Sequence, residues 1–166
     1  EYRFDVVSKG TMSHAYVMSF ESEYEAFEKF AEFNPGNVVV LLDTYDTLNS
    51  GLPNAIKLFK KLREEGKLNG LYGIRMDSGD MAYFSKKIRE AFDAEGFTDA
   101  VISASSDLDE YLISDLKAQG AKINMWGVGT KMITAFDCPA LGGVYKLSEL
   151  TDKDGVKQPK IKISDD

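Results

Sequence analysis

The feature that most constrains the fold of this chain is an unbroken apolar run from Val38 to Leu42, which lies between Asn37 and Asp43. Five consecutive apolar residues leave no polar face, so a strand made of them must be buried on both sides. Strands of this kind are typical of parallel sheets whose connecting helices cover them. The run therefore predicts a strand over residues 37–42 inside a parallel α/β sheet.

Strand and helix patterns alternate along most of the chain. Further strands are predicted over residues 5–8, 71–74, 100–103, 122–126 and 143–147. Helices are predicted between them, over residues 15–33, 53–65, 81–95 and 108–119, because apolar residues recur there at helical spacing and a glycine or Pro35-Gly36 follows each one. This alternation predicts an α/β fold built as a parallel βα array.

A closed barrel and an open doubly wound sheet both fit this pattern. The five or six strands are fewer than the eight of a complete regular barrel. We expect residues 1–150 to form most of an irregular TIM-like α/β barrel that lacks its first strands. The pattern breaks after Leu147, so residues 151–166, with a short strand over 161–163, are expected to be a tail or the start of a strand belonging to another domain.

Composition excludes several classes of protein. The chain has 166 residues, 43% of them hydrophobic, which is enough for one domain core. A net charge of −7 without a basic cluster argues against nucleic acid as a partner, and no apolar run reaches the ~20 residues of a membrane span. Glu1 opens no signal peptide, so a cytoplasmic location is expected, and the missing initiating methionine suggests an excised or processed piece.

The cysteine and histidine content limits the metal chemistry. A single cysteine, Cys138, excludes an internal disulfide framework and a cysteine-built metal site. Only oxygen ligands for a hard cation such as Mg²⁺ remain. The sequence also shows no nucleophile–histidine–acid triad.

Charged residues follow the predicted strand over 71–74. Arg75, Asp77 and Asp80 are crowded into the turn that opens the next helix, with Ser78 and Gly79 between the two carboxylates. Helix capping by Asp77 or Ser78, with Asp80 in the first turn, explains the pattern equally well. A ligand site is favoured because the ends of the other predicted strands are also polar, and parallel sheets bind ligands at the carboxyl ends of their strands.

Two of these strand ends carry the histidine and further acids. The segment after residues 5–8 holds His14, the only histidine, ahead of a long predicted helix whose N-terminus would favour an anion. Capping by Thr11 or Ser13 with an incidental histidine is the alternative. After residues 37–42, Asp43 is placed to orient a neighbour, while capping of the next helix by Asp46 or Thr47 is expected.

The last two strand ends point to a phosphosugar. After residues 100–103, Ser106 or Asp107 is expected to cap the following helix. After residues 122–126, Gly127 and Gly129 would let backbone amides approach an anion, and Thr130 adds a hydroxyl, although the longer pattern of a nucleotide P-loop is missing. Together these residues predict a sugar-phosphate site. The glycines would bind phosphate, the carboxylates would bind ribose hydroxyls, and the arginine would bind an anionic or planar group.

Six of these segments, taken in order, resemble nicotinate phosphoribosyltransferase. The resemblance covers roughly residues 5–150, and the six together are far more specific than any one of them. The segments are Gly10-Thr11-Met12-Ser13-His14, Leu42-Asp43-Thr44-Tyr45-Asp46-Thr47, Ile74-Arg75-Met76-Asp77-Ser78-Gly79-Asp80, Ser105-Ser106-Asp107-Leu108-Asp109-Glu110, Trp126-Gly127-Val128-Gly129-Thr130 and Leu141-Gly142-Gly143-Val144-Tyr145-Lys146.

The resemblance implies a role for each matching residue. His14 is expected to be the catalytic residue that ATP phosphorylates transiently, and Thr11 and Arg75 are expected to hold nicotinate. Asp77 and Asp107 match acids near the ribose hydroxyls. Finally, the 5′-phosphate would lie against Gly127, Gly129 and Thr130.

The family resemblance also implies the reaction. Nicotinate and phosphoribosyl pyrophosphate would give nicotinate mononucleotide and pyrophosphate, coupled to ATP hydrolysis, in NAD salvage. Mg²⁺ would accompany ATP and phosphoribosyl pyrophosphate, with no tightly bound organic cofactor and no resident metal. A homodimer is expected for the full-length protein, because proteins of this family are much longer and many complete their site across a dimer interface.

Other functions stay open at this point. The chain could be a non-catalytic phosphosugar-binding or structural module of a related phosphoribosyltransferase, of the nicotinamide or quinolinate type. Nicotinamide-specific relatives usually carry Asn where this chain has Asp80, and the lysine- and arginine-rich clamp of the quinolinate enzymes is not recognisable here.

Overall fold

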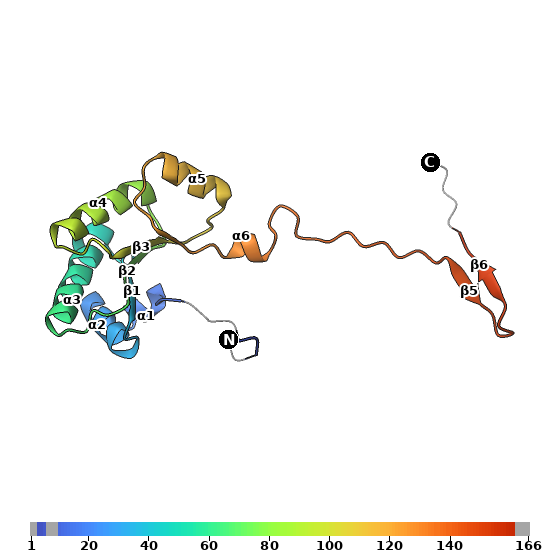
Figure 1. Cartoon of the computed structure of the whole chain (residues 1–166), viewed down its shortest axis with the longest axis horizontal. Helices are drawn as coiled ribbons and strands as arrows, with labels where there is room; N and C mark the ends of the chain where they lie inside the picture. Colours follow the sequence, from blue (N-terminus) through green and yellow to red (C-terminus); the bar gives the residue numbers. More distant parts are fainter. Residues whose placement is uncertain (1–2, 6–9, 162–166) are drawn as a thin grey trace.

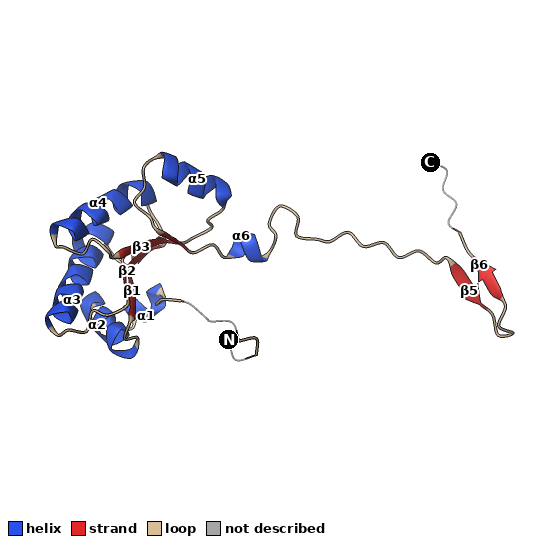
Figure 2. Cartoon of the chain, in the orientation of Figure 1, coloured by secondary structure: helices blue, strands red, loops and turns tan. Residues whose placement is uncertain are grey.

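The computed structural model describes residues 3–5 and 10–161, in which helices and strands alternate over the first three quarters of the chain (Figures 1 and 2). The elements, in chain order, are α1 (His14–Met18), α2 (Glu23–Phe33), β1 (Asn37–Leu41), the π-helical turn η1 (Thr47–Gly51), α3 (Leu52–Glu64), β2 (Leu71–Met76), α4 (Met81–Ala94), β3 (Val101–Ala104), α5 (Glu110–Ala118), β4 (Met125–Trp126), α6 (Thr130–Ile133), β5 (Glu149–Thr151) and β6 (Lys157–Pro159).

Strands β1 to β4 form one parallel sheet in the order β1-β2-β3-β4, which confirms the predicted parallel α/β fold. Each strand is therefore bonded to the next strand along the chain, and the order of the strands does not reverse. Helices α3 and α4 each connect two neighbouring strands, and Figure 1 shows them on the same side of the sheet. The carboxyl ends of the four strands consequently meet at one edge.

The core lies between the sheet and its covering helices. The apolar residues of β1 are buried as predicted, with Val40 and Leu41 both at 0% exposure. Phe59, Phe92 and Phe97 are among the largest buried side chains, and their ring centroids lie 5.9 to 6.4 Å apart in tilted or edge-on geometries. Tilted and edge-on pairs are the favoured aromatic arrangements, so these rings stabilise the helical layer on the sheet.

The predicted helix over residues 15–33 is wrong, because the chain forms two helices there instead of one. Ser19 ends α1, and its hydroxyl donates to the Tyr16 carbonyl over 2.7 Å. Ser22 starts α2 by accepting the Glu25 amide over 3.2 Å. Serine side chains compete with helical backbone bonds in this way, which explains a break without proline or glycine.

Strand β4 is shorter than the predicted strand over 122–126. Only Met125 and Trp126 pair with β3, opposite Ser103 and Ala104. Just before them, the Asn124 side chain accepts the Ile102 amide over 2.8 Å, and the Asn124 amide donates to the Ile102 carbonyl over 3.0 Å. A side chain thus satisfies the Ile102 amide where a strand would have used its backbone carbonyl.

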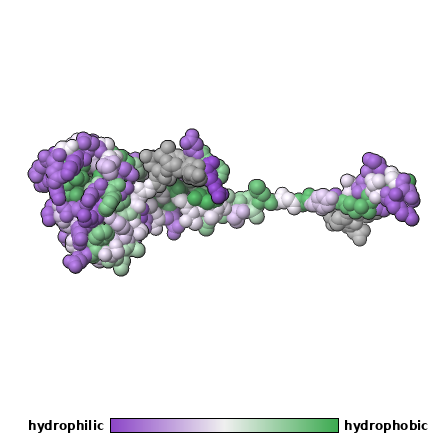
Figure 3. All heavy atoms as spheres, turned by 90° about the horizontal axis from the view of Figure 1, so that it is seen from below, coloured by the Kyte–Doolittle hydropathy of each residue, from purple (hydrophilic) through white to green (hydrophobic). Residues whose placement is uncertain are grey.

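The predicted strand over residues 143–147 is also wrong. Residues 141–148 have no secondary structure and are exposed, and they lead to a separate antiparallel hairpin of β5 and β6. Figure 3 shows this segment as a narrow neck, with hydrophobic atoms at its surface, between the α/β body and the hairpin. The hairpin straddles the boundary expected at residue 150, while the predicted strands over 5–8 and 161–163 lie largely outside the described residues.

None of the described helices combines the length and apolar character needed to cross a membrane.

Candidate functional site

Backbone hydrogen bonds bring the residues after each strand to the same edge of the sheet. The Leu42 amide donates to the Arg75 carbonyl over 3.1 Å, and the Ser105 amide donates to the Met76 carbonyl over 3.0 Å. The Gly127 amide continues the ladder to the Ala104 carbonyl over 2.8 Å. Four polar segments that are far apart in the sequence therefore lie side by side where a parallel sheet binds its ligands.

Asp43 fixes the turn after β2. Its side chain is 3% exposed, and its Oδ2 accepts the Asp77 amide over 3.0 Å and the Ser78 hydroxyl over 2.5 Å. Its Oδ1 has no hydrogen-bond partner among the described residues and lies 3.9 Å from His14 Nε2. The expectation that Asp43 orients a neighbour is confirmed, and the neighbour is the turn that carries Asp77.

His14 lies between a hydroxyl and two carboxylates. Its Nδ1 lies 3.1 Å from the Thr44 hydroxyl, while its Nε2 lies 3.9 Å from Asp43 Oδ1 and 3.7 Å from Asp77 Oδ2. The ring is 38% exposed, so solvent and small molecules can reach it. Ser13 caps α1 as one alternative foresaw, but the contacts of the histidine ring are not those of an incidental side chain.

The helix that follows His14 is not the long one expected. α1 has five residues, so the anion support expected from a long helix N-terminus is missing at this position. The charges nearest to the ring are instead the carboxylates of Asp43 and Asp77. Carboxylates beside an imidazole help to fix the orientation of its ring.

Arg75 extends the cluster to Thr11. Its Nη1 donates to the Thr11 hydroxyl over 2.8 Å, and its Nη2 lies 3.9 Å from Asp77 Oδ1. Its Nε is buried without a partner among the described residues, and the side chain is 23% exposed. Since a guanidinium has five N–H donors, this one retains capacity for a carboxylate or another planar anion.

Asp80, and neither Asp77 nor Ser78, caps α4. Its carboxylate accepts the Tyr83 amide over 2.9 Å. Asp77 is consequently free of a capping role, and its Oδ1 accepts the Ser105 hydroxyl instead. Capping of α4 thus belongs to Asp80, and Asp77, three residues earlier, keeps its place among the predicted site residues.

The cap predicts the effect of removing Asp80. Asp80→Ala should lower the free energy of unfolding by about 1 kcal/mol, the usual value of an N-cap, and leave unchanged the affinity for nicotinate, the substrate that the sequence resemblance implies. Glu90→Ala, an exposed carboxylate on the same helix, serves as the control and should change stability by less than about 0.5 kcal/mol. Urea unfolding and a nicotinate titration measure both quantities, and a loss of nicotinate affinity in Asp80→Ala would contradict the assignment.

The cap of α5 also differs from expectation. Asp109 caps this helix by accepting the Leu112 amide over 2.7 Å, so the predicted caps Ser106 and Asp107 are wrong. This backbone bond, together with the ammonium of Lys131, lowers the pKa of the Asp109 carboxyl. Asp107 lies just before it, exposed and in the left-handed region with φ +46°, and its carboxylate is open to solvent.

Asp46 is the cap of the helical turn that follows β1. It caps η1 by accepting the Leu48 and Asn49 amides over 3.1 and 2.9 Å, which confirms one of the two expected caps. Hydrogen bonds from the Asn49 side chain and amide lower the pKa of Asp46. Asp43 and Thr44 are left to serve the site.

The glycine segment after β4 is close to the cluster but not bonded to it. A Cβ on Gly127 would meet the Ser105 side chain at 3.2 Å, whereas a Cβ on Gly129 would meet nothing within 4 Å. Gly129 precedes α6, whose first residue is Thr130. The next residue, Lys131, pairs with Asp109, and this hydrogen bond raises the pKa of the lysine.

The structure therefore brings four of the predicted site residues into one set of contacts: Thr11, His14, Arg75 and Asp77. Gly127 adjoins them through Ser105. Asp107, Gly129 and Thr130 lie on the neighbouring strand ends and form no hydrogen bond or salt bridge with the cluster among the described residues. The prediction did not name Thr44 or Ser105 as contributors, although both contact the cluster. Their only signal in the sequence was that they stand in the polar segments that follow β1 and β3.

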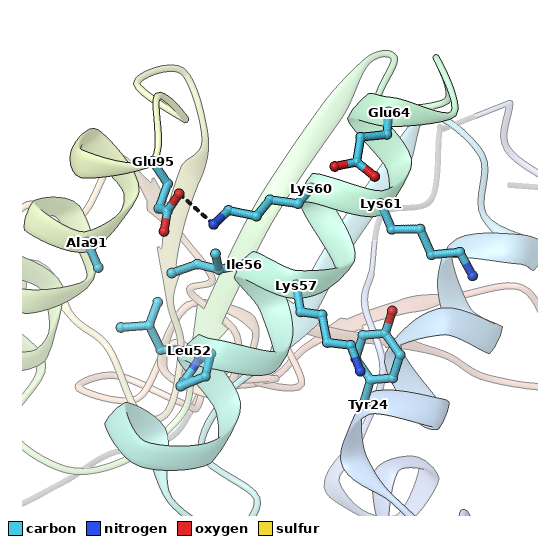
Figure 4. Close-up of a pocket in the computed structure, with 10 residues that line it drawn as sticks. Tyr24, Leu52, Ile56, Lys57, Lys60, Lys61, Glu64, Ala91 and Glu95 are labelled. Atoms are coloured by element: carbon cyan, nitrogen blue, oxygen red, sulfur yellow. Dashed lines mark ion pairs between the residues drawn. The ribbon is translucent and has the colours of Figure 1, made fainter.

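A largely apolar surface hollow lies elsewhere. A cavity of about 760 Å³ is formed on the helical side by residues of α2, α3 and α4, shown in Figure 4. Its lysines already have partners: Lys60 pairs with Glu95 at 2.7 Å, Lys61 with Glu28 at 2.9 Å, and Lys57 lies over the Tyr24 ring at 3.7 Å. None of the predicted site residues lines it, so the strand ends remain the better candidate site.

The part of the chain that the structure describes holds no group of three or more His, Cys, Asp or Glu side chains able to bind a metal ion.

Comparisons with known proteins agree with the motifs. The chain is 55% identical over 162 residues to nicotinate phosphoribosyltransferase from Bacillus subtilis, a match that covers 98% of this chain and 32% of the relative. It is 34% identical over 151 residues to the human protein of the same name, covering 87% of this chain and 27% of the relative. These matches confirm the predicted resemblance, and the chain spans about a third or less of the relatives' length. No family model matches the chain.

A solved structure shows that the fold is shared. The crystal structure of human nicotinic acid phosphoribosyltransferase matches with a TM-score of 0.69 at 24% identity, over 76% of this chain and 36% of that chain. Most of the arrangement of helices and strands thus recurs in a longer protein, of which the match covers about a third.

Proposed function

We propose that this chain is part of a nicotinate phosphoribosyltransferase and carries the residues that hold nicotinate, ribose and phosphate. The full-length protein would convert nicotinate and phosphoribosyl pyrophosphate to nicotinate mononucleotide and pyrophosphate, in NAD salvage, with ATP hydrolysis coupled to the reaction. Sequence identity to named nicotinate phosphoribosyltransferases along 98% of the chain supports this proposal.

One observation carries the proposal beyond the resemblance. Thr11, His14, Arg75 and Asp77 come from two segments about 60 residues apart in the sequence, yet they form one continuous set of polar contacts at the strand ends. The partly exposed guanidinium and the buried, unpartnered Nε of Arg75 suit an anionic, planar substrate such as nicotinate.

The proposed reaction needs little proton transfer by the protein. The ring nitrogen of nicotinate would attack the anomeric carbon of the ribose as the bond to pyrophosphate breaks, through an oxocarbenium-like state. Asp77, held by Asp43 and Ser105, would stabilise the developing positive charge and bind ribose hydroxyls. Asp107, on the neighbouring strand end, would be the second acid for the ribose. Mg²⁺ enters the proposal only as the ion that accompanies phosphoribosyl pyrophosphate and ATP.

His14 would serve energy coupling and not bond making. Transient phosphorylation of its ring would bias the protein toward tight substrate binding, and hydrolysis would release the product. Its exposure and its orientation by Thr44 support this role, because a nucleophilic ring must be reachable and held in place.

We also propose that the sheet belongs to an irregular TIM-like barrel. Four parallel strands in sequential order, with connecting helices on one side, are the arrangement of a barrel segment, whereas a doubly wound sheet reverses its strand order. The remaining strands would come from the rest of the polypeptide. The homodimer, the cytoplasmic location and the assignment of residues 151–166 to another domain stay predictions.

The test uses the full-length protein. Nicotinate mononucleotide and pyrophosphate should form in equal amounts from nicotinate and phosphoribosyl pyrophosphate, faster with ATP than without it. Replacing nicotinate by nicotinamide or quinolinate should abolish product. Binding of phosphoribosyl pyrophosphate without pyrophosphate release would favour the alternative of a non-catalytic phosphosugar-binding module, and no binding would favour a structural one.

The glycine segment gives a separate prediction about the phosphate. Gly129→Val should keep the fold, because its Cβ has open space, yet weaken nicotinate mononucleotide by at least about tenfold by occupying the room for phosphate oxygens. Gly142→Val is the matched control, since Gly142 also has open space but lies in the exposed neck. Calorimetric titration and a melting curve measure both effects, and normal nucleotide binding in a folded Gly129→Val protein would contradict the phosphate assignment.

A further inference from the structure

Glu23 is a buried carboxylate that the proposed reaction does not use. It is the first residue of α2 and is 4% exposed. Its Oε2 accepts the Ser50 hydroxyl over 2.6 Å and the Asn54 side-chain amide over 2.9 Å. Within residues 3–5 and 10–161 it forms no salt bridge, and its Oε1 has no hydrogen-bond partner. A buried carboxylate without a cation is costly, so its presence needs an explanation.

Glu23 joins two helices. It opens the eleven-residue helix α2, while Ser50 and Asn54 lie at the joint where η1 runs into α3. Two side-chain hydrogen bonds thereby connect the first turn of α2 to this joint. The carboxylate in turn holds the start of α2 against the start of α3.

On one side, Glu23 is connected to the candidate site through η1, which contains its partner Ser50. Asp46 caps η1, and the two residues before Tyr45 are Asp43 and Thr44. Gly51, the last residue of η1, packs so tightly on the end of β1 that a Cβ there would lie 2.2 Å from the Leu42 carbonyl oxygen. The loop that carries Asp43 and Thr44 is therefore short, and it is held by β1 at one end and by η1 at the other.

The chain before Glu23 leads to the site on the other side. α1, which begins with His14, packs on α2 through Tyr16: its ring lies 4.9 Å from that of Phe20 and 6.3 Å from that of Phe30. Val17 of α1 is fully buried as well. α1 and α2 thus form one packed unit that has His14 at one end and Glu23 at the joint with η1.

These contacts form a closed circuit. It runs from His14 through α1, α2 and Glu23 to η1, and it returns through Thr44 to Nδ1 of His14. We propose that Glu23 is a positioning residue, whose buried carboxylate sets the separation between the His14 ring and the Thr44–Asp43 loop. The proposal deepens the function proposed above and rests on it for its consequence in catalysis, although the positioning itself can be measured without substrate.

The experiment compares four variants of the full-length protein. Glu23→Ala removes both hydrogen bonds, Glu23→Gln keeps an oxygen that can accept them, and Ser50→Ala removes only the bond to η1. Glu25→Ala is the matched control, since it removes a carboxylate from the same first turn of α2 that forms no salt bridge among the described residues. The ¹⁵N chemical shifts of the His14 ring, assigned by their absence in His14→Asn, report the hydrogen bond to Thr44.

Glu23→Ala should change the His14 ring shifts and slow the phosphorylation of His14 by ATP by about 10- to 100-fold, because misplacement of a reacting group costs rate. Glu23→Gln should restore most of both, and Glu25→Ala should match the wild type. If Glu23→Ala does not fold, Ser50→Ala should show a smaller change of the same kind.

Unchanged His14 shifts in a folded Glu23→Ala or Ser50→Ala protein would overturn the proposal, as would the same change in Glu25→Ala. If the wild-type protein makes no nicotinate mononucleotide, the proposed function fails, but the ring shifts still decide whether Glu23 positions His14.

Discussion

His14→Asn in the full-length protein is expected to abolish ATP hydrolysis and phosphoprotein formation. Asparagine can still hydrogen-bond to Thr44, so the fold should survive, but it offers no nucleophilic ring nitrogen. Slow formation of nicotinate mononucleotide without ATP should remain at high substrate concentration, because the attacking nitrogen belongs to nicotinate. Incubation with γ-labelled ATP should place an acid-labile, base-stable label on the wild-type peptide Ser13-His14-Ala15 and none on the variant.

Two control variants make this result specific. Ser13→Ala removes the cap of α1 and should leave the label on His14. Thr44→Val removes only the hydrogen bond to Nδ1 and should slow labelling by about 3- to 10-fold, the effect of one ordinary hydrogen bond. Label on Ser13 or Thr11, or ATP stimulation that survives His14→Asn, would show that the imidazole is not the phosphorylated group.

Arg75→Ala should weaken the binding of nicotinate by roughly 10- to 150-fold, which corresponds to the 1.5–3 kcal/mol expected of a charge-assisted contact. The KM for phosphoribosyl pyrophosphate should change far less, because the glycine segment after β4 is expected to hold the phosphate. Steady-state kinetics with each substrate varied in turn measure both constants.

Arg75→Lys is the informative companion to this variant. Lysine keeps the positive charge but not the planar fork, so it should recover only part of the nicotinate affinity if the contact is bidentate. Thr11→Val should weaken nicotinate less than Arg75→Ala, because it removes only the side chain that holds Nη1. An unchanged KM for nicotinate in Arg75→Ala would remove Arg75 from the site.

The sequence was a good guide to local structure wherever one interaction dominates. The apolar run at residues 38–42 could be buried only between layers, and it is the central part of β1 and the residue after it. Glycines at the ends of the predicted helices marked real endings, because Gly66, Gly96 and Gly120 all have a positive φ that other residues adopt with difficulty.

Local signals were misleading where several residues could do the same work. Ser106, Asp107 and Asp109 are all good caps, and the choice of Asp109 follows from the left-handed backbone at the other two, which only the folded loop reveals. The break between α1 and α2 is made by Ser19 and Ser22, whose hydroxyls are equally compatible with a continuous helix until tertiary packing turns the chain.

The site itself divides in the same way. The sequence alone determined which residue types stand after each strand, and hence that an arginine, a histidine and several carboxylates would gather at one edge of a parallel sheet. Only the tertiary structure decided their pairing, because contacts such as His14 with Thr44, Arg75 with Thr11 and Glu23 with Ser50 join residues 27 to 64 positions apart. Such contacts depend on strand register and helix packing, which are set by the whole core and have no local signal in the chain.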